Sequence, residues 1–159
     1  METEQEALQR NFPTLVEWVN YEIKSDPTPE YNCLAWALGI DWASFNPEPF
    51  TGGYQWFPGV ERIWTRETIL KILANHNYQE EADRTLEQGW EKIAIYDDIH
   101  GIPQHFARQL QSGRWTSKMG RLNDIEHYNL ECLEGYEAYG PVSRILKRRV
   151  FDGKSKTEI

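Results

Sequence analysis

The stretch QHFARQLQSGRWTSKM, residues 104–119, decides the predicted fold because it holds two strand patterns and one turn. Apolar and polar residues alternate on both sides of the turn, as is typical of half-buried β-strands. The QSG segment at 111–113 supplies the glycine that a short hairpin loop favours. We therefore expect an antiparallel hairpin.

The length of the loop sets the register of this hairpin. A three-residue loop pairs Leu110 with Arg114 and makes His105 and Ser117 diagonal neighbours on one face of the sheet. Their side chains could then form a hydrogen bond. A two-residue loop would shift the register and bring a neighbour of Ser117 beside His105 instead.

Three helices are expected around this hairpin, each behind a side chain suited to an N-cap. Asn32 would cap a very short helix that begins at Cys33, Thr65 would cap a longer one, and Asp124 would cap one ending near Gly135. These helices would pack against the sheet.

Further segments complete the predicted domain. WEKIAIY at 90–96 predicts a third strand, residues 21–23 predict a short one, and 141–150 fit a helix or a strand. Residues 40–64 predict a long ordered loop. We expect a single globular α+β domain over 1–151, with a small antiparallel sheet packed against the Cys-bearing helix, and a flexible tail over 152–159.

The bulk composition excludes several classes of partner. The formal net charge is −8, which repels nucleic acid phosphates, so no nucleic acid partner is expected. We find no secretion signal and no apolar run near 18 residues, which predicts a cytoplasmic protein without a membrane partner. Two cysteines cannot form a disulfide framework, so both are expected to be reduced thiols.

Cys33, in YNCLAWALG at 31–39, is the candidate nucleophile. A helix N-terminus favours the thiolate, so the pKa of Cys33 should fall. His105 would lower it further by forming a thiolate–imidazolium pair. The backbone N–H of Cys33 could donate to an oxyanion, helped by the Asn32 amide or the Tyr31 hydroxyl.

Other residues are candidates for positioning the base or the substrate. Ser117 or Asp124 would orient His105, and Asp124 would share a helix face with His127. Gln109 shares the strand face of His105 and is a candidate substrate contact. The loop carrying Tyr54, Trp56 and Phe57 would line a substrate groove.

Metal and cofactor sites are not expected. The histidines and cysteines, Cys33 and Cys132 among them, lack the short spacings of metal ligands, and no nucleotide-binding glycine motif is present. We therefore predict no metal and no cofactor.

The order of these parts resembles papain-like cysteine hydrolases, particularly the NlpC-type cell-wall endopeptidases. The resemblance covers Asn32-Cys33 and residues 90–120. It implies a papain-like fold with Cys33 as nucleophile, His105 as base and Ser117 as third member. The chain departs from that family in having serine where histidine, asparagine, aspartate or glutamine is usual, and in its shorter helix.

A second resemblance spans nearly the whole chain. The phrases FPTL, YNCLAWALG, EKIAIY, HFARQL, GRWTSKMG and DIEH, in this order, resemble a bacterial family of uncharacterised small cytoplasmic proteins. This resemblance implies one intact domain and no particular activity.

Two functions remain open at this point. The first is a cysteine-dependent hydrolase or acyl transferase that cleaves an amide or ester bond of a peptide or protein through Cys33 and His105. The alternative is a non-catalytic papain-like module that binds a peptide or protein partner, with Cys33 buried and inert. The sequence predicts no oligomeric state.

Overall fold

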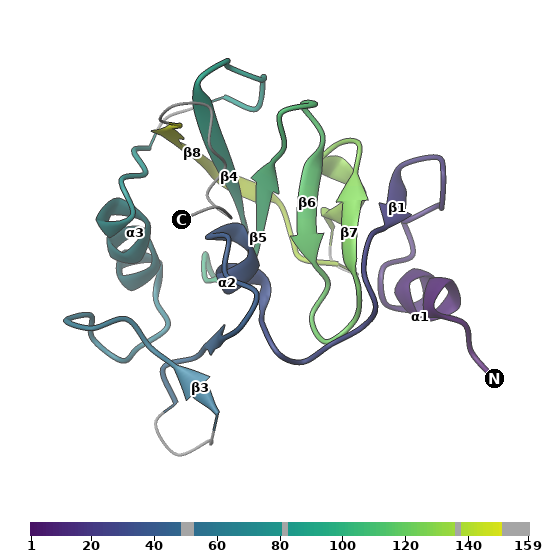
Figure 1. Cartoon of the computed structure of the whole chain (residues 1–159), viewed down its shortest axis with the longest axis horizontal. Coiled ribbons are helices and arrows are strands. Elements are labelled where there is room, and N and C mark those ends of the chain that lie inside the picture. The colour runs from purple at the N-terminus through teal and green to yellow at the C-terminus, as the bar shows by residue number, and fades with distance from the viewer. Residues whose placement is uncertain (49–52, 81–82, 136–137, 151–159) are drawn as a thin grey trace.

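The computed structural model describes residues 1–48, 53–80, 83–135 and 138–150, and shows a mixed α+β fold (Figure 1). Six strands form one antiparallel sheet in the order β1-β7-β6-β5-β4-β8. These strands are β1 (Tyr21–Ile23), β4 (Trp90–Asp97), β5 (Pro103–Gln109), β6 (Trp115–Lys118), β7 (Asp124–His127) and β8 (Val142–Arg149). A separate parallel pair consists of β2 (Ser44–Phe45) and β3 (Tyr54–Gln55). The helices are α1 (Glu4–Asn11), α2 (Cys33–Ala37), α3 (Arg66–Asn75) and the 3-10 helix η1 (Glu131–Leu133).

Hydrophobic cores cover both faces of the sheet. The front face carries Ile93 and Phe106, which pack with buried residues of α2 and α3, and Figure 1 shows α2 in front of the sheet beside β5. The back face carries Ala94 and Ala107, which pack with Leu8 of α1 and with η1. Full burial of a large apolar side chain such as Ile93, Phe106 or Leu8 contributes roughly 1.5–3 kcal/mol, so the two cores stabilise both faces of the sheet.

The β5–β6 hairpin has the register that a three-residue loop predicts. Arg108 pairs with Thr116, and the Leu110 N–H donates to the Arg114 carbonyl at 2.7 Å. The β5–β6 ladder ends at the Arg108 pair, although β5 continues to pair with β4 and β6 with β7. The two strands are therefore unpaired at the end of the hairpin that carries His105.

The prediction of a helix that begins after Asp124 is wrong. Residues 124–127 form β7, which pairs with β6 on one side and β1 on the other, and only 131–133 are helical. The segment 124–127 has only one apolar side chain, so its hydrophobic pattern fits the period of a helix as well as that of a strand. Pairing with the neighbouring strands makes it a strand. Residues 141–150 contain β8, a strand, and the loop at 40–64 contains β2 and β3. The predicted tail at 152–159 lies outside the described residues.

Thr65 caps α3, as its position before the helix predicts. Its Oγ1 accepts the Thr68 N–H at 3.1 Å, and Ile69 and Ile72 are buried on the following turns. We expect Thr65→Ala to lower the free energy of unfolding by about 1 kcal/mol, because one N–H at the helix start loses its acceptor. Urea unfolding measures this change. Thr65→Ser keeps the acceptor and should unfold close to the wild type, and equal losses in both variants would contradict the capping role.

None of the helices in the described part of the chain is both long enough and apolar enough to span a bilayer.

Candidate functional site

A chain of buried hydrogen bonds crosses the back face of the sheet. His105 Nε2 on β5 lies 2.9 Å from Ser117 Oγ on β6, and Ser117 Oγ lies 2.8 Å from His127 Nε2 on β7. The other ring nitrogen of His127 lies 2.7 Å from the carbonyl oxygen of Asn129. All three side chains are fully buried. We call His105, Ser117 and His127 the relay.

The Asn129 carbonyl at the end of the relay determines which group donates in each of its hydrogen bonds. The Asn129 carbonyl only accepts, so Nδ1 of His127 carries the proton and its Nε2 is an acceptor in the neutral ring. The Ser117 hydroxyl therefore donates to His127 and accepts from Nε2–H of His105. Nδ1 of His105 is then a bare acceptor, and it is buried without a hydrogen-bond partner.

Burial keeps both imidazoles neutral. It lowers the pKa of His127 to about 4, although the hydrogen bond to the Asn129 carbonyl opposes this shift. Burial, and next the charge that His127 would carry, lowers the pKa of His105 well below its usual value. Both shifts agree with the neutral forms that the hydrogen bonds require.

Cys33 begins α2, and its thiol is protonated at neutral pH. Burial raises the pKa of Cys33 to about 11, while the backbone N–H groups of Phe106, Leu34 and Cys33 itself hydrogen-bond to the sulfur and partly oppose the shift. The expected lowering of this pKa is therefore wrong, as is a resting thiolate–imidazolium pair. The helix has only five residues, so its dipole is too weak to outweigh desolvation.

Cys33 and His105 approach the sheet from opposite faces. The helix α2 packs on the front face, whereas the His105 ring contacts the back-face rings of Tyr96 and Tyr139. The sulfur nevertheless accepts from the N–H of Phe106, the residue after His105, beyond the last β5–β6 pair. No hydrogen bond joins the sulfur to Nδ1 of His105 in the described structure.

Tyr139 covers the His105 ring and is also affected by the charge of a Cys33 thiolate. Its ring stacks on the His105 ring with centroids 4.0 Å apart and planes 4° apart. Burial, and next the charge that a Cys33 thiolate would carry, raises the pKa of Tyr139. The sulfur is therefore within electrostatic range of the ring that covers His105. No sequence pattern identified Tyr139 as part of this site.

Asp124 does not orient His105, contrary to the expectation from sequence. It faces the front of the sheet, where its Oδ2 accepts the Tyr31 hydroxyl at 2.6 Å. Burial raises the pKa of Asp124 and lowers the pKa of Lys118, which stands next to it. Because Asp124 and His127 lie three residues apart in a strand, their side chains point to opposite faces.

The predicted oxyanion donors Tyr31 and Asn32 are both engaged elsewhere. The Tyr31 hydroxyl donates to Asp124, and the Asn32 amide donates to the Phe45 carbonyl at 2.7 Å. Oδ1 of Asn32 caps α2 by accepting the Ala35 N–H at 3.1 Å. The third predicted donor, the backbone N–H of Cys33, interacts with the sulfur of Cys33 itself.

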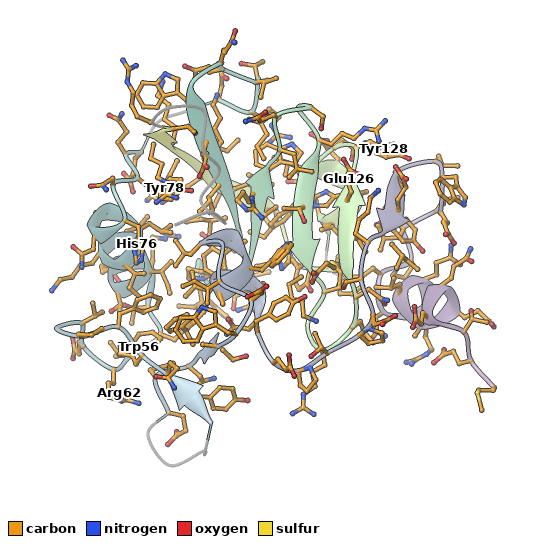
Figure 2. The ribbon with its side chains drawn as sticks, in the orientation of Figure 1. Trp56, Arg62, His76, Tyr78, Glu126 and Tyr128 are labelled. Carbon is orange, nitrogen blue, oxygen red and sulfur yellow. The ribbon has the colours of Figure 1, made fainter. Side chains whose placement is uncertain are left out.

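Three of the four predicted substrate contacts have other hydrogen-bond partners or lie away from Cys33. Gln109 lies at the far end of β5 and donates to the Arg84 carbonyl at 3.0 Å. Trp56 donates to the Glu61 carbonyl at 3.0 Å, and Figure 2 shows it below α3. Tyr54 is 40% exposed on β3. The predicted groove along this loop stays a prediction.

His127 is the member of the relay whose role sequence analysis missed. The signal was its register, since β7 pairs His127 with Trp115 of β6 and with Tyr21 of β1. That register places His127 on the back face with Ser117. Among the described residues, no group of three or more His, Cys, Asp or Glu side chains is placed to hold a metal ion.

The fold and the site define a mixed α+β domain with a buried histidine relay and a cysteine at a helix start. A family model matches residues 22–147, so the chain belongs to the family described as a domain of unknown function, DUF7689. The match includes Cys33 and all three members of the relay. No curated protein matches the chain, and no solved structure matches it.

Proposed function

We propose that this domain is a papain-like, cysteine-dependent enzyme that transfers an acyl group from an amide or ester to water or another acceptor. One observation carries the proposal. The relay holds His105 in the tautomer whose Nδ1 is a bare, buried acceptor, and the neighbouring Phe106 N–H contacts the Cys33 sulfur. Nucleophilic catalysis by cysteine needs a base with a free lone pair that can reach the thiol.

The proposed reaction begins from a thiol and a neutral imidazole. Nδ1 of His105 takes the thiol proton as the Cys33 sulfur forms a bond to the substrate carbonyl carbon. The imidazolium then returns this proton to the leaving amine or alcohol as the bond to the leaving group breaks. Water or another acceptor attacks the resulting thioester, with His105 accepting its proton and returning it to the sulfur.

Ser117 and His127 act as positioning residues in this scheme. Ser117 fixes the plane of the His105 ring, and His127 fixes the direction of the Ser117 hydroxyl. The scheme requires the sulfur and Nδ1 to move within hydrogen-bond distance when substrate binds. Catalytic hydrogen bonds are often long in unliganded enzymes and shorten in the complex.

A binding module with an inert Cys33 is the second candidate function. The raised pKa of Cys33, caused by burial, favours it, as does the Tyr139 ring that covers His105. Its partner would be a peptide or a protein. The two candidates differ in whether His105 assists reactions of the thiol.

Alkylation by limiting iodoacetamide tests whether His105 assists the thiol. If His105 accepts the proton, the labelling rate of Cys33 should level off above about pH 6, because the base is already neutral. His105→Gln should lower this rate about tenfold or more at pH 7 and make it rise about tenfold per pH unit, as for an unassisted thiol. Mass spectrometry separates label on Cys33 from label on Cys132.

Two controls accompany this measurement. His100→Gln changes an exposed loop histidine and should leave the Cys33 rate unchanged. Cys132 is buried, and burial raises its pKa to about 12, so its rapid labelling would reveal unfolding of a variant. If the rate and pH profile of Cys33 are the same in the wild type and in folded His105→Gln, the inert binding module is the correct alternative.

A further inference from the structure

Arg108 on β5 is a buried guanidinium that forms no salt bridge with a described residue, although the negative charges of Glu91 and Asp124 act on it and oppose the lowering of its pKa by burial. Only 7% of its surface is exposed, and its Nε has no hydrogen-bond partner. No salt bridge joins it to a carboxylate in the part of the chain that the structure describes, and its Cζ lies 5.5 Å from the centroid of the Trp36 ring. A buried charge without a partner costs several kcal/mol, so its presence requires a reason.

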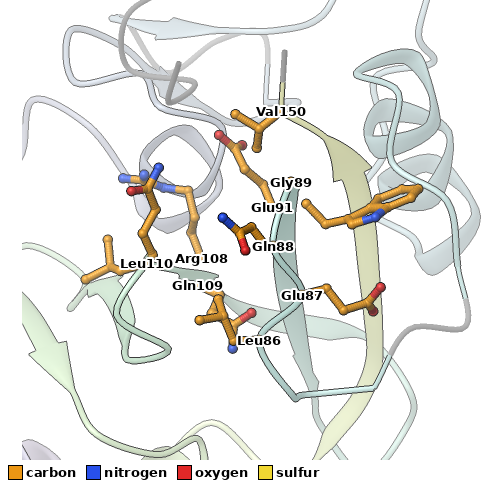
Figure 3. A pocket seen from close by; sticks show the side chains of 11 residues that line it. Leu86, Glu87, Gln88, Gly89, Glu91, Arg108, Gln109, Leu110 and Val150 are labelled. Carbon is orange, nitrogen blue, oxygen red and sulfur yellow. The ribbon is translucent and has the colours of Figure 1, made fainter. Parts of the chain in front are cut away.

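Arg108 lines a cavity of about 720 Å³ at the end of the sheet where β4 begins and β5 ends (Figure 3). Apolar side chains from three segments line the same cavity, and glutamine amides lie among them. These are Leu86, Leu110 and Val150, with Gln88 and Gln111. Pockets of this size with an apolar lining and a few polar groups are typical of small-molecule sites.

The acidic residues of the cavity are neutralised by other cations. Glu91 lies 3.3 Å from Arg148, and Glu87 lies 2.8 Å from Lys92 and 3.1 Å from Lys147. Figure 3 shows Glu91 on β4 and Arg108 on β5 at the same opening. Arg108 is therefore the cation among the described lining residues that forms no salt bridge, although the charge of Glu91 partly compensates it.

We propose that this cavity binds a small organic monocarboxylate. The ligand carboxylate accepts hydrogen bonds from Arg108, and its apolar part packs against Leu86, Leu110 and Val150. The unpartnered Nε–H of Arg108 can donate to a carboxylate oxygen, and a monocarboxylate adds less negative charge than a phosphate dianion to a protein of net charge −8. This site does not depend on the chemistry proposed for Cys33.

Isothermal titration calorimetry of the full chain tests the site with N-acetyl-leucine and benzoate as probes. At least one of the two acids should bind. Its uncharged amide should bind at least about tenfold more weakly, because it loses a charged hydrogen bond, and inorganic phosphate should also bind at least about tenfold more weakly. Arg108→Met should weaken the acid by the same factor. Arg121→Met removes an exposed guanidinium and should leave binding unchanged.

A second measurement on the unliganded protein separates a ligand site from a structural arginine. If Arg108 is held for a ligand, Arg108→Met removes an unpaired buried charge, and the urea midpoint should rise. A fall in that midpoint would show that the guanidinium stabilises the fold and would overturn the proposal. Equal affinity for acid and amide, or no binding of either acid up to about 10 mM, would also overturn it.

Discussion

Between about pH 7 and pH 4 the free energy of unfolding is expected to fall by about 3 kcal/mol through His127 alone. Burial lowers the pKa of this imidazole to about 4 in the folded protein, whereas in the unfolded chain it takes up a proton near pH 6.5. Between these values the unfolded state binds more protons than the folded state, so stability falls as the pH falls. Well above pH 6.5 neither state is protonated and the contribution is flat.

Two neighbouring groups modify this dependence. His105 acts in the same direction as His127, because burial also lowers its pKa. Asp124 acts in the opposite direction, because burial raises its pKa and the folded state then takes up a proton first. Asp124 is 3% exposed and is also buried, but two histidines act against one carboxylate, so we expect the histidines to dominate.

Urea unfolding at a series of pH values between 7 and 4 measures this dependence. His127→Gln removes one titrating group and should make the dependence shallower, whatever its stability at neutral pH. His100 is exposed in a loop, so His100→Gln should keep the full dependence. The result that would contradict the buried neutral relay is a wild-type stability that does not change from pH 7 to pH 5.

The sequence was sufficient to predict the central hairpin because its determinants are local. The strand pattern and the QSG loop together set the register, and the register brings His105 next to Ser117. The caps at Asn32 and Thr65 were predictable for the same reason, since each acts on the following turn.

The rest of the site depends on contacts between distant segments. Residues 124–127 are a strand because β1, about a hundred residues earlier in the chain, forms its outer edge. Asp124 was assigned to His105 although its partner is Tyr31, which is 93 residues away. The pKa of Cys33 is raised, contrary to the prediction, because the sequence reveals the start of the helix and not the desolvation of the thiol. Burial and long-range pairing are the information that a local pattern lacks.

Replacing Ser117 with alanine is the substitution expected to damage the relay most directly. The hydroxyl accepts from one imidazole and donates to the other. Its removal leaves one buried donor on His105 and one buried acceptor on His127, and each unsatisfied group costs about 1–3 kcal/mol. We therefore expect the free energy of unfolding at neutral pH to fall by about 3 kcal/mol, measured by urea unfolding.

Thr116→Ala is the matched control for Ser117→Ala. Thr116 is the preceding residue of β6 and points to the front face, where its hydroxyl accepts from Trp36 Nε1 at 2.9 Å. Losing that single bond should cost about 1 kcal/mol, clearly less than losing two. If Ser117→Ala costs no more than Thr116→Ala, the serine does not join the histidines. In the proposed reaction Ser117 positions His105, so Ser117→Ala should also slow the alkylation of Cys33, whereas Thr116→Ala should not. This measurement separates a structural role from a positioning role.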